Sequence, residues 1–154
     1  MKLQASSWLA VVRAYNECNR RYTQLLAGFD LTIPQFDVLN AILNLDREAT
    51  PKRIADELVV TRGNITGVLH RLQERKLVTT RHHEKDGRSF VCELTTAGRK
   101  LLMRARGAAS IFITQQLSPF DDATLKETGE LMRRMHSHLQ TIDPAEILSQ
   151  EAYQ

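Results

Sequence analysis

The chain has 154 residues, 42% of them hydrophobic and 25% charged, and a formal net charge of +3. This length and composition are typical of a globular protein with one domain and its own core. No apolar run approaches the roughly 18 residues that cross a bilayer, and residues 1–4 lack the features of a signal peptide, so we expect a cytoplasmic protein.

The N-terminal part of the sequence predicts three helices. Apolar residues recur every three or four positions over residues 6–27, which indicates an amphipathic helix that stops near Gly28. Each of the next two helices is predicted to begin with a threonine cap and a proline in the first turn. The pairs are Thr32 with Pro34 and Thr50 with Pro51.

A fourth helix and a β-hairpin are predicted to follow. Residues 62–75 carry an inward stripe of Ile65, Val68, Leu69 and Leu72, with Thr61 as a candidate cap. Two short helices joined by a tight turn, the second of them basic, form a helix-turn-helix pattern. Residues 78–95 hold two strand-favouring runs around a Lys-Asp-Gly-Arg tip, which is turn chemistry. The unit is therefore expected to be winged.

The C-terminal part is predicted to form two more helices. Thr95 or Thr96 can cap a helix through Leu117, and Ser118, followed by Pro119, is expected to cap the last one. The terminal helices have apolar faces that little of the chain is available to cover. We therefore expect an intertwined homodimer.

Together these elements predict a mainly α protein with a small β wing. The expected organisation is an N-terminal dimerisation helix at residues 1–30, a winged helix-turn-helix DNA-binding domain at 31–100, and C-terminal dimerisation helices at 101–154.

Basic charge is concentrated in the winged region. Residues 50–100 hold eleven Lys and Arg against six Asp and Glu, whereas the remainder holds ten against twelve. An uneven distribution of this kind favours a polyanionic partner. Glycine on the exposed face of the fourth helix costs about 0.5–1 kcal/mol of stability relative to alanine. Because glycine has no side chain, it is useful where the backbone must approach a partner closely. The predicted DNA contacts on this helix are Thr61, Arg62, Gly63, Asn64, Thr66, Gly67, His70 and Arg71, and those on the hairpin are Arg81, Lys85, Asp86 and Arg88.

The segments LTIPQFDVL, IADELVVTRGNITGVLHRLQERKLV, DGR and ELTTAGRKLL, in this order and spacing, resemble the MarR family of bacterial transcriptional regulators. The resemblance implies a homodimeric winged-helix repressor that binds double-stranded DNA at an inverted repeat and responds to a small phenolic or lipophilic ligand. It assigns Arg88 to the minor groove and implies that Asp86 fixes the geometry of that arginine. Candidate ligand-binding residues are Trp8, Tyr15 and Phe36, whose alternative role is in the core or at the dimer contact.

Two positions depart from the family pattern. Many members carry arginine where this chain has Gly67, so one phosphate or base contact is missing. The peroxide-sensing branch has its reactive cysteine near the position of Trp8, almost three turns before Cys18, so redox sensing is not carried over.

The sequence favours no metal site, no cofactor and no enzymatic activity. His82, His83 and Cys92 lack ligand spacing, since adjacent strand residues point to opposite faces. No nucleophile, metalloprotease or phosphate-loop motif is present. The alternative interpretation is a winged-helix protein-interaction adaptor. An adaptor predicts apolar residues on the exposed helix face, whereas this chain has Arg, Gly, Asn, Thr and His there.

Overall fold

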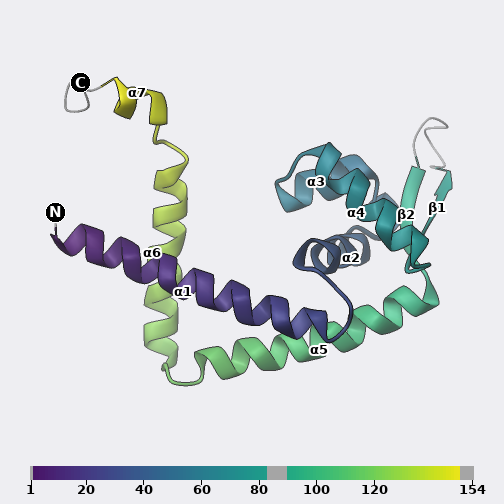
Figure 1. Cartoon of the computed structure of the whole chain (residues 1–154), viewed down its shortest axis with the longest axis horizontal. Helices are drawn as coiled ribbons and strands as arrows, with labels where there is room; N and C mark the ends of the chain where they lie inside the picture. Colours follow the sequence, from purple (N-terminus) through teal and green to yellow (C-terminus); the bar gives the residue numbers. More distant parts are fainter. Residues whose placement is uncertain (1, 83–89, 150–154) are drawn as a thin grey trace. The chain divides into compact units, whose positions relative to one another are not determined.

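The computed structural model describes residues 2–82 and 90–149. The chain forms two units, residues 1–112 and 113–154. The first contains, in chain order, α1 (Lys2–Ala27), α2 (Ile33–Leu45), the 3-10 turn η1 (Asp46–Glu48), α3 (Pro51–Leu58), α4 (Arg62–Glu74), β1 (Val78–His82), β2 (Phe90–Leu94) and most of α5 (Thr96–Leu117). The second contains the end of α5, α6 (Asp122–Leu139) and α7 (Pro144–Leu148). The predicted mainly α fold with a small β wing is confirmed (Figure 1).

The predicted threonine caps of α2 and α3 are present. The Thr32 hydroxyl accepts a hydrogen bond from the Gln35 amide at 3.4 Å, and the Gln35 side chain accepts one from the Thr32 amide at 3.0 Å. Thr50 accepts one from the Arg53 amide at 3.3 Å. Thr61 precedes α4, but its side chain makes no capping bond there.

The start of the last long helix differs from the sequence prediction. Asp121, not Ser118, caps α6, because its carboxylate accepts from the Thr124 amide at 2.8 Å, and this hydrogen bond lowers the pKa of Asp121. The Ser118 hydroxyl instead donates to the Gln115 carbonyl at 3.0 Å, so it closes the end of α5. The short elements η1 and α7 were not predicted.

The core of the first unit draws on every helix and strand in it. Fully buried side chains come from α1 through α5: Leu26, Val38, Leu39, Ile54, Leu72, Val91, Cys92 and Leu102. Tyr22 of α1 packs edge-on against Phe36 of α2, with ring centroids 6.1 Å apart. The end of α1 and the first half of α5 are therefore part of the core that supports the winged unit.

The hairpin is antiparallel, with Val78 opposite Leu94 and Arg81 opposite Val91. Its second strand is also held from the other side, since the Cys92 amide donates to the Ala49 carbonyl at 2.9 Å. This bond ties the hairpin to the segment that precedes α3.

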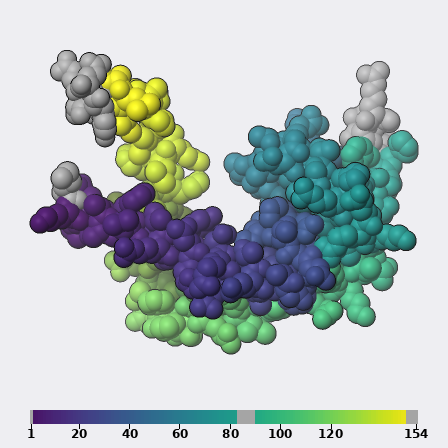
Figure 2. All heavy atoms as spheres, viewed as in Figure 1, coloured from purple at the N-terminus to yellow at the C-terminus, as the bar shows by residue number. Residues whose placement is uncertain are grey.

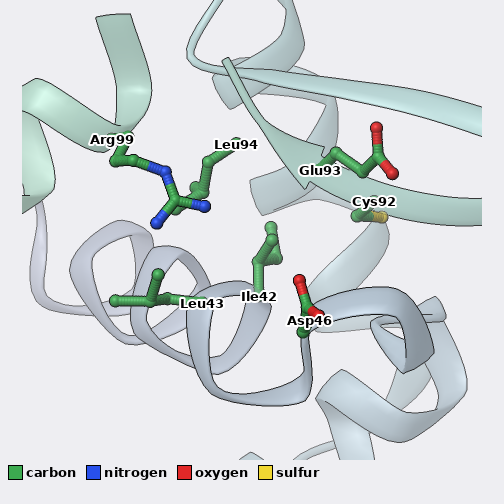
Figure 3. A pocket seen from close by; sticks show the side chains of 7 residues that line it. All are labelled: Ile42, Leu43, Asp46, Cys92, Glu93, Leu94 and Arg99. Atoms are coloured by element: carbon green, nitrogen blue, oxygen red, sulfur yellow. The ribbon is translucent and has the colours of Figure 1, made fainter. Parts of the chain in front are cut away.

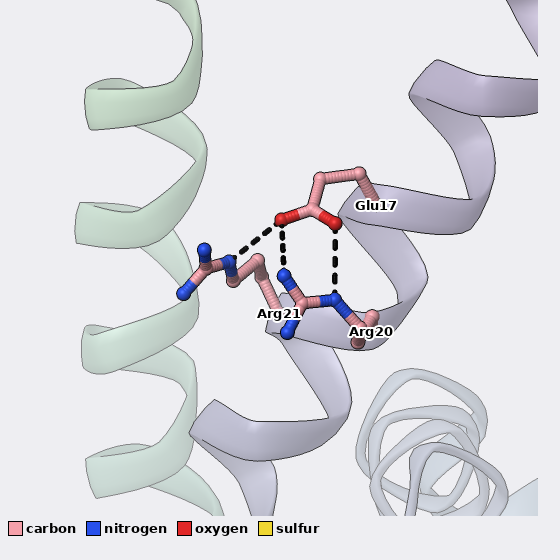
Figure 4. Close-up of polar contacts among 3 residues, drawn as sticks. All are labelled: Glu17, Arg20 and Arg21. Atoms are coloured by element: carbon pink, nitrogen blue, oxygen red, sulfur yellow. Dashed lines mark hydrogen bonds and ion pairs between the residues drawn. The ribbon is translucent and has the colours of Figure 1, made fainter.

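Three exposed side chains of α1 form an ion-pair group. The Glu17 carboxylate accepts from Arg20 at 2.6 Å and from Arg21 at 2.8 Å (Figure 4). The hydrogen bonds from Arg20 and then from Arg21 lower the pKa of Glu17 from 4.5 to about 2. A carboxyl group whose pKa is lowered by folding stabilises the folded state at pH values above its unfolded pKa. The stability that Glu17 contributes is therefore lost as the pH falls from about 4.5 to about 2. Exposed pairs of this kind contribute little at neutral pH.

The turn between α3 and α4 contains a strained residue. Val59 has φ of 53°, a left-handed conformation in which a β-branched side chain is unfavourable, and it is 91% exposed. We expect Val59→Gly to raise the free energy of unfolding by on the order of 1 kcal/mol, because the strain is removed and almost no buried surface is lost. Thermal unfolding followed by circular dichroism at a fixed protein concentration measures this.

The neighbouring Val60 is the matched control for this turn. It is 42% exposed and has no positive φ. Val60→Gly should lower the midpoint temperature of thermal unfolding, because glycine there only adds conformational entropy to the unfolded chain. A lower midpoint for Val59→Gly than for the parent protein would contradict the assignment of strain.

Candidate nucleic-acid interface

The fourth helix presents a polar outer face. Ile65, Leu69 and Leu72 are buried, as predicted, while Val68 is half-buried. All eight predicted contact residues of this region are exposed: Thr61, Arg62, Gly63, Asn64, Thr66, Gly67, His70 and Arg71. The space around the helix where they lie is open to a partner.

The two glycines of this face leave its backbone accessible. A Cβ atom added at Gly63 or at Gly67 would meet nothing within 4 Å in the described structure. No internal packing therefore requires glycine at either position. The two residues lower the helix surface over about one turn, which is the arrangement that a closely approaching partner needs.

An open groove of about 650 Å³ separates α4 from the hairpin. Its lining residues come from the start of α3, from α4 and from both strands: Thr50, Pro51, Lys52, Arg62, Thr66, Leu69, His70, Gln73, Thr80 and Phe90. In the space-filling view, α3 and α4 form one continuous surface next to the strands (Figure 2). Lys52, Thr80 and Phe90 were not singled out from the sequence. Lys52 is one of the eleven basic residues of 50–100, and this concentration of charge is the sequence signal that points to it.

Three residues of the predicted interface, Thr66, Arg81 and His70, already have side-chain partners within the protein. The Thr66 hydroxyl donates to the Arg62 carbonyl at 3.0 Å. The Nε atom of Arg81 donates to the Glu93 carboxylate at 2.5 Å, so its charge is neutralised on the hairpin itself. His70 lies 3.5 Å from Glu74 one turn later. The remaining predicted contacts of the hairpin, Lys85, Asp86 and Arg88, lie outside the described residues, as does His83.

The end of α4 is fixed to the rest of the first unit. A guanidinium nitrogen of Arg75 donates to the Asp30 carbonyl in the loop between α1 and α2, at 2.5 Å. Lys76 then adopts a left-handed φ of 56°, which turns the chain into β1. The position of α4 is therefore fixed relative to α1 and α2.

Comparison with known proteins agrees with this architecture. The family model described as MarR family matches residues 29–89. An uncharacterized HTH-type transcriptional regulator of Bacillus cereus is 33% identical over 135 residues, which are 85% of this chain and 87% of that protein.

The chain belongs to the MarR family.

Solved structures show the same fold. The S. aureus MepR–DNA complex matches with a TM-score of 0.76 and 22% identity over 86% of this chain and 96% of that one. The organohalide-sensing regulator RdhR, in its form bound to 2,4-dichlorophenol, matches with a TM-score of 0.78 and 15% identity over 90% and 82%. This MarR-family chain therefore shares its fold with both of these proteins.

The predicted ligand-binding residues are not brought together within one chain of this MarR-family protein. Phe36 is 6% exposed in the core against Tyr22, whereas Trp8 and Tyr15 are 63% and 67% exposed on α1. None of the three lines the groove between α4 and the hairpin. Their role in ligand binding stays a prediction that depends on a second copy.

A smaller pocket of about 210 Å³ lies between the end of α2, β2 and the start of α5. Figure 3 shows its seven lining side chains: Ile42, Leu43, Asp46, Cys92, Glu93, Leu94 and Arg99. Two carboxylates and one guanidinium give it no single charge preference. Among residues 2–82 and 90–149, no group of three His, Cys, Asp or Glu side chains could hold a metal ion, and no helix is long and apolar enough to cross a membrane.

The thiol of Cys92 is expected to be inert. Its side chain is fully buried, and burial raises its pKa from 9.0 to about 11, so about one thiol in a thousand is ionised at about pH 8. In a Cys18→Ala variant, an alkylating reagent should leave Cys92 unmodified until denaturant is added. Mass spectrometry of the labelled protein measures this, and rapid labelling in the folded state would contradict it.

Proposed function

We propose that this protein is a sequence-specific DNA-binding regulator that acts as a homodimer on an inverted-repeat operator. The observation that carries the proposal is the outer face of α4, on which Arg62, Asn64 and Thr66 are exposed beside two glycines with open space above them. Arginine and asparagine are the side chains that read guanine and adenine in the major groove, and a helix reads bases with its N-terminal residues.

The hairpin is assigned to the minor groove. Lys85, Asp86 and Arg88 belong to its tip in the sequence, and an arginine is attracted by the negative potential of a narrow minor groove. Arg81 has a supporting role in this proposal, because its ion pair with Glu93 braces β1 against β2. The crystallised complex of the similar regulator MepR with DNA supports the use of this fold on duplex DNA.

The homodimer is inferred from apolar residues that the chain leaves exposed. On α1, Leu3 and Trp8 are 79% and 63% exposed, and on α6, Leu131 and Leu139 are 55% and 57% exposed. No residue of α6 is buried. Faces of this kind mark interaction surfaces, and a two-fold partner would bury them.

A small-molecule effector, repression as the outcome and a cytoplasmic location complete the proposal. The effector is supported by the 2,4-dichlorophenol-bound form of the similar regulator RdhR. Repression and location follow from what the family resemblance implies. An inverted repeat with half-site centres about one helical turn apart, roughly 10 base pairs, matches two-fold symmetry in the protein.

The proposed division of work between helix and hairpin predicts different losses for two arginines. Arg62→Ala should cost on the order of 1–3 kcal/mol of binding and relax the preference at one base position. Arg88→Ala should weaken binding across many sequences and reduce the salt dependence by about one unit of slope, because one phosphate-region contact is lost. Selection of DNA from a random pool, followed by titration at several salt concentrations, measures both.

Arg106→Ala is the matched control, since it removes the same charge from an exposed position of α5, outside α4 and the hairpin. It should leave base preference unchanged. Equal losses on specific and random DNA for Arg62→Ala and Arg88→Ala would contradict the division of work. A chain that selects no DNA sequence at all would instead favour the protein-interaction adaptor.

A further inference from the structure

A second groove lies behind the proposed DNA-reading helix. It has a volume of about 380 Å³, within the range of small-molecule sites. Its walls come from the start of α2, from the α3–α4 turn and from the inner side of α4: Pro34, Asp37, Val38, Leu58, Val60, Asn64, Ile65 and Val68. Six of these eight side chains are apolar, so the groove suits an apolar body.

Asp37 is the ionisable group of this lining. It is half-buried, and burial raises the pKa of its carboxyl group. Within residues 2–82 and 90–149, its side chain accepts no hydrogen bond and forms no ion pair. A carboxylate that is partly removed from water and has no partner is unfavourable, and a cation placed against it would relieve that cost.

We propose that this groove binds a lipophilic amine, with the apolar part of the ligand against Val38, Ile65 and Val68 and the ammonium group on Asp37. The ammonium group supplies a cationic partner for Asp37, and the charge-assisted hydrogen bond between them forms in surroundings of low polarity. A neutral ligand of the same shape leaves the carboxylate unpaired, and an anionic one meets repulsion. The site is therefore selective for positive charge.

The groove is placed to affect DNA binding. Asn64, assigned above to base contact, also lines this groove, and Ile65 and Val68 lie on the inner side of the same helix. A ligand that engages Asn64 withdraws it from a base, so ligand and DNA compete for that side chain. Binding of the amine should weaken DNA binding, and by linkage DNA should weaken binding of the amine to the same extent. This coupling rests on the proposed function, whereas the amine site does not.

Calorimetry of the full-length protein without DNA tests the site. The probes are phenylbutylamine, its neutral counterpart phenylbutanol and its anionic counterpart phenylbutyrate. We expect the amine to bind at least about tenfold more tightly than the alcohol, which is the difference that one charge-assisted bond supplies, and the acid to bind more weakly still.

Two variants locate the binding. Asp37→Asn keeps the side-chain shape and should lower the affinity for the amine by about tenfold while leaving the affinity for the alcohol unchanged. Asp56→Asn removes the same charge from an exposed position of α3 that does not line the groove, and it should change neither. Val68→Phe fills the groove and should weaken both ligands, with far-ultraviolet circular dichroism confirming that the variant is folded.

Several results would overturn the site: no amine binding to the parent protein, equal affinity for amine and alcohol, or an unchanged amine affinity in Asp37→Asn. A separate titration of the protein with its selected DNA, with and without phenylbutylamine, tests the coupling. Failure to bind DNA, together with amine binding that depends on Asp37, would reject the proposed function and leave the amine site supported.

Discussion

Gly98→Ala should destabilise the protein by about 2–3 kcal/mol, although alanine is the better helix former. A Cβ atom at this position would lie 2.0 Å from the Leu77 carbonyl oxygen and 2.9 Å from the carbonyl carbon, both of them backbone atoms that cannot rotate away. The first turn of α5 would have to move off the start of β1. The free energy of unfolding in urea, compared with that of the parent protein, measures the effect.

The close contact at Gly98 is enforced by Thr95. The Thr95 amide donates to the Leu77 carbonyl at 3.0 Å, its hydroxyl donates to the Lys76 carbonyl at 2.8 Å, and the same hydroxyl accepts from the Gly98 amide at 3.0 Å. These bonds hold α5 against the end of the α4–β1 turn. A shift of α5 that relieves the clash between the alanine Cβ and Leu77 would stretch these bonds, which is why we expect a large loss of stability.

Gly107→Ala is the matched control, because it is the same substitution in the same helix. A Cβ atom at Gly107 would meet nothing within 4 Å in the described structure. This variant should gain about 0.5–1 kcal/mol from helix propensity. If Gly98→Ala were as stable as Gly107→Ala, the contact between α5 and β1 would not be tight in solution.

Leu131→Glu combined with Leu139→Glu should convert the protein to a monomer at micromolar concentration and reduce operator affinity by on the order of 100-fold or more. Together with Met135, these residues form a stripe at spacings of four along α6, and they are 37–57% exposed. A buried, unpaired carboxylate is strongly unfavourable at a subunit contact. Each monomer then offers a single reading helix to the DNA.

Ser137→Glu is the control for this stripe. It adds a negative charge to the opposite side of α6, at an exposed position, and should leave the dimer intact. Sedimentation measures the assembly, and titration with the selected operator measures the affinity. A stripe variant that stays dimeric would place the subunit contact elsewhere. A parent protein that is monomeric, or a selected site without two-fold symmetry, would reject the dimer itself.

Local interactions explain why so much of the fold was predictable. The caps at Thr32 and Thr50 depend on residues three positions apart, and the buried stripe of Ile65, Leu69 and Leu72 depends on helical periodicity. The error at the start of α6 has the same origin. Serine and aspartate are both favoured at an N-cap, and in the folded chain Asp121, not the predicted Ser118, takes that position.

The sequence by itself determined the helices α1 to α6, the hairpin, the family and the polar outer face of α4, since each depends on residue types at short and regular spacing. Tertiary structure alone decided which distant residues meet. It placed Gly98 against Leu77, paired Arg81 with Glu93, and separated Phe36 from Trp8 and Tyr15. Among the described residues, it also left the Asp37 side chain without a hydrogen-bond or ion-pair partner in an apolar groove. The physical reason is that these contacts join segments far apart in the chain, and their distances are set by the packing of a shared core that no local pattern records.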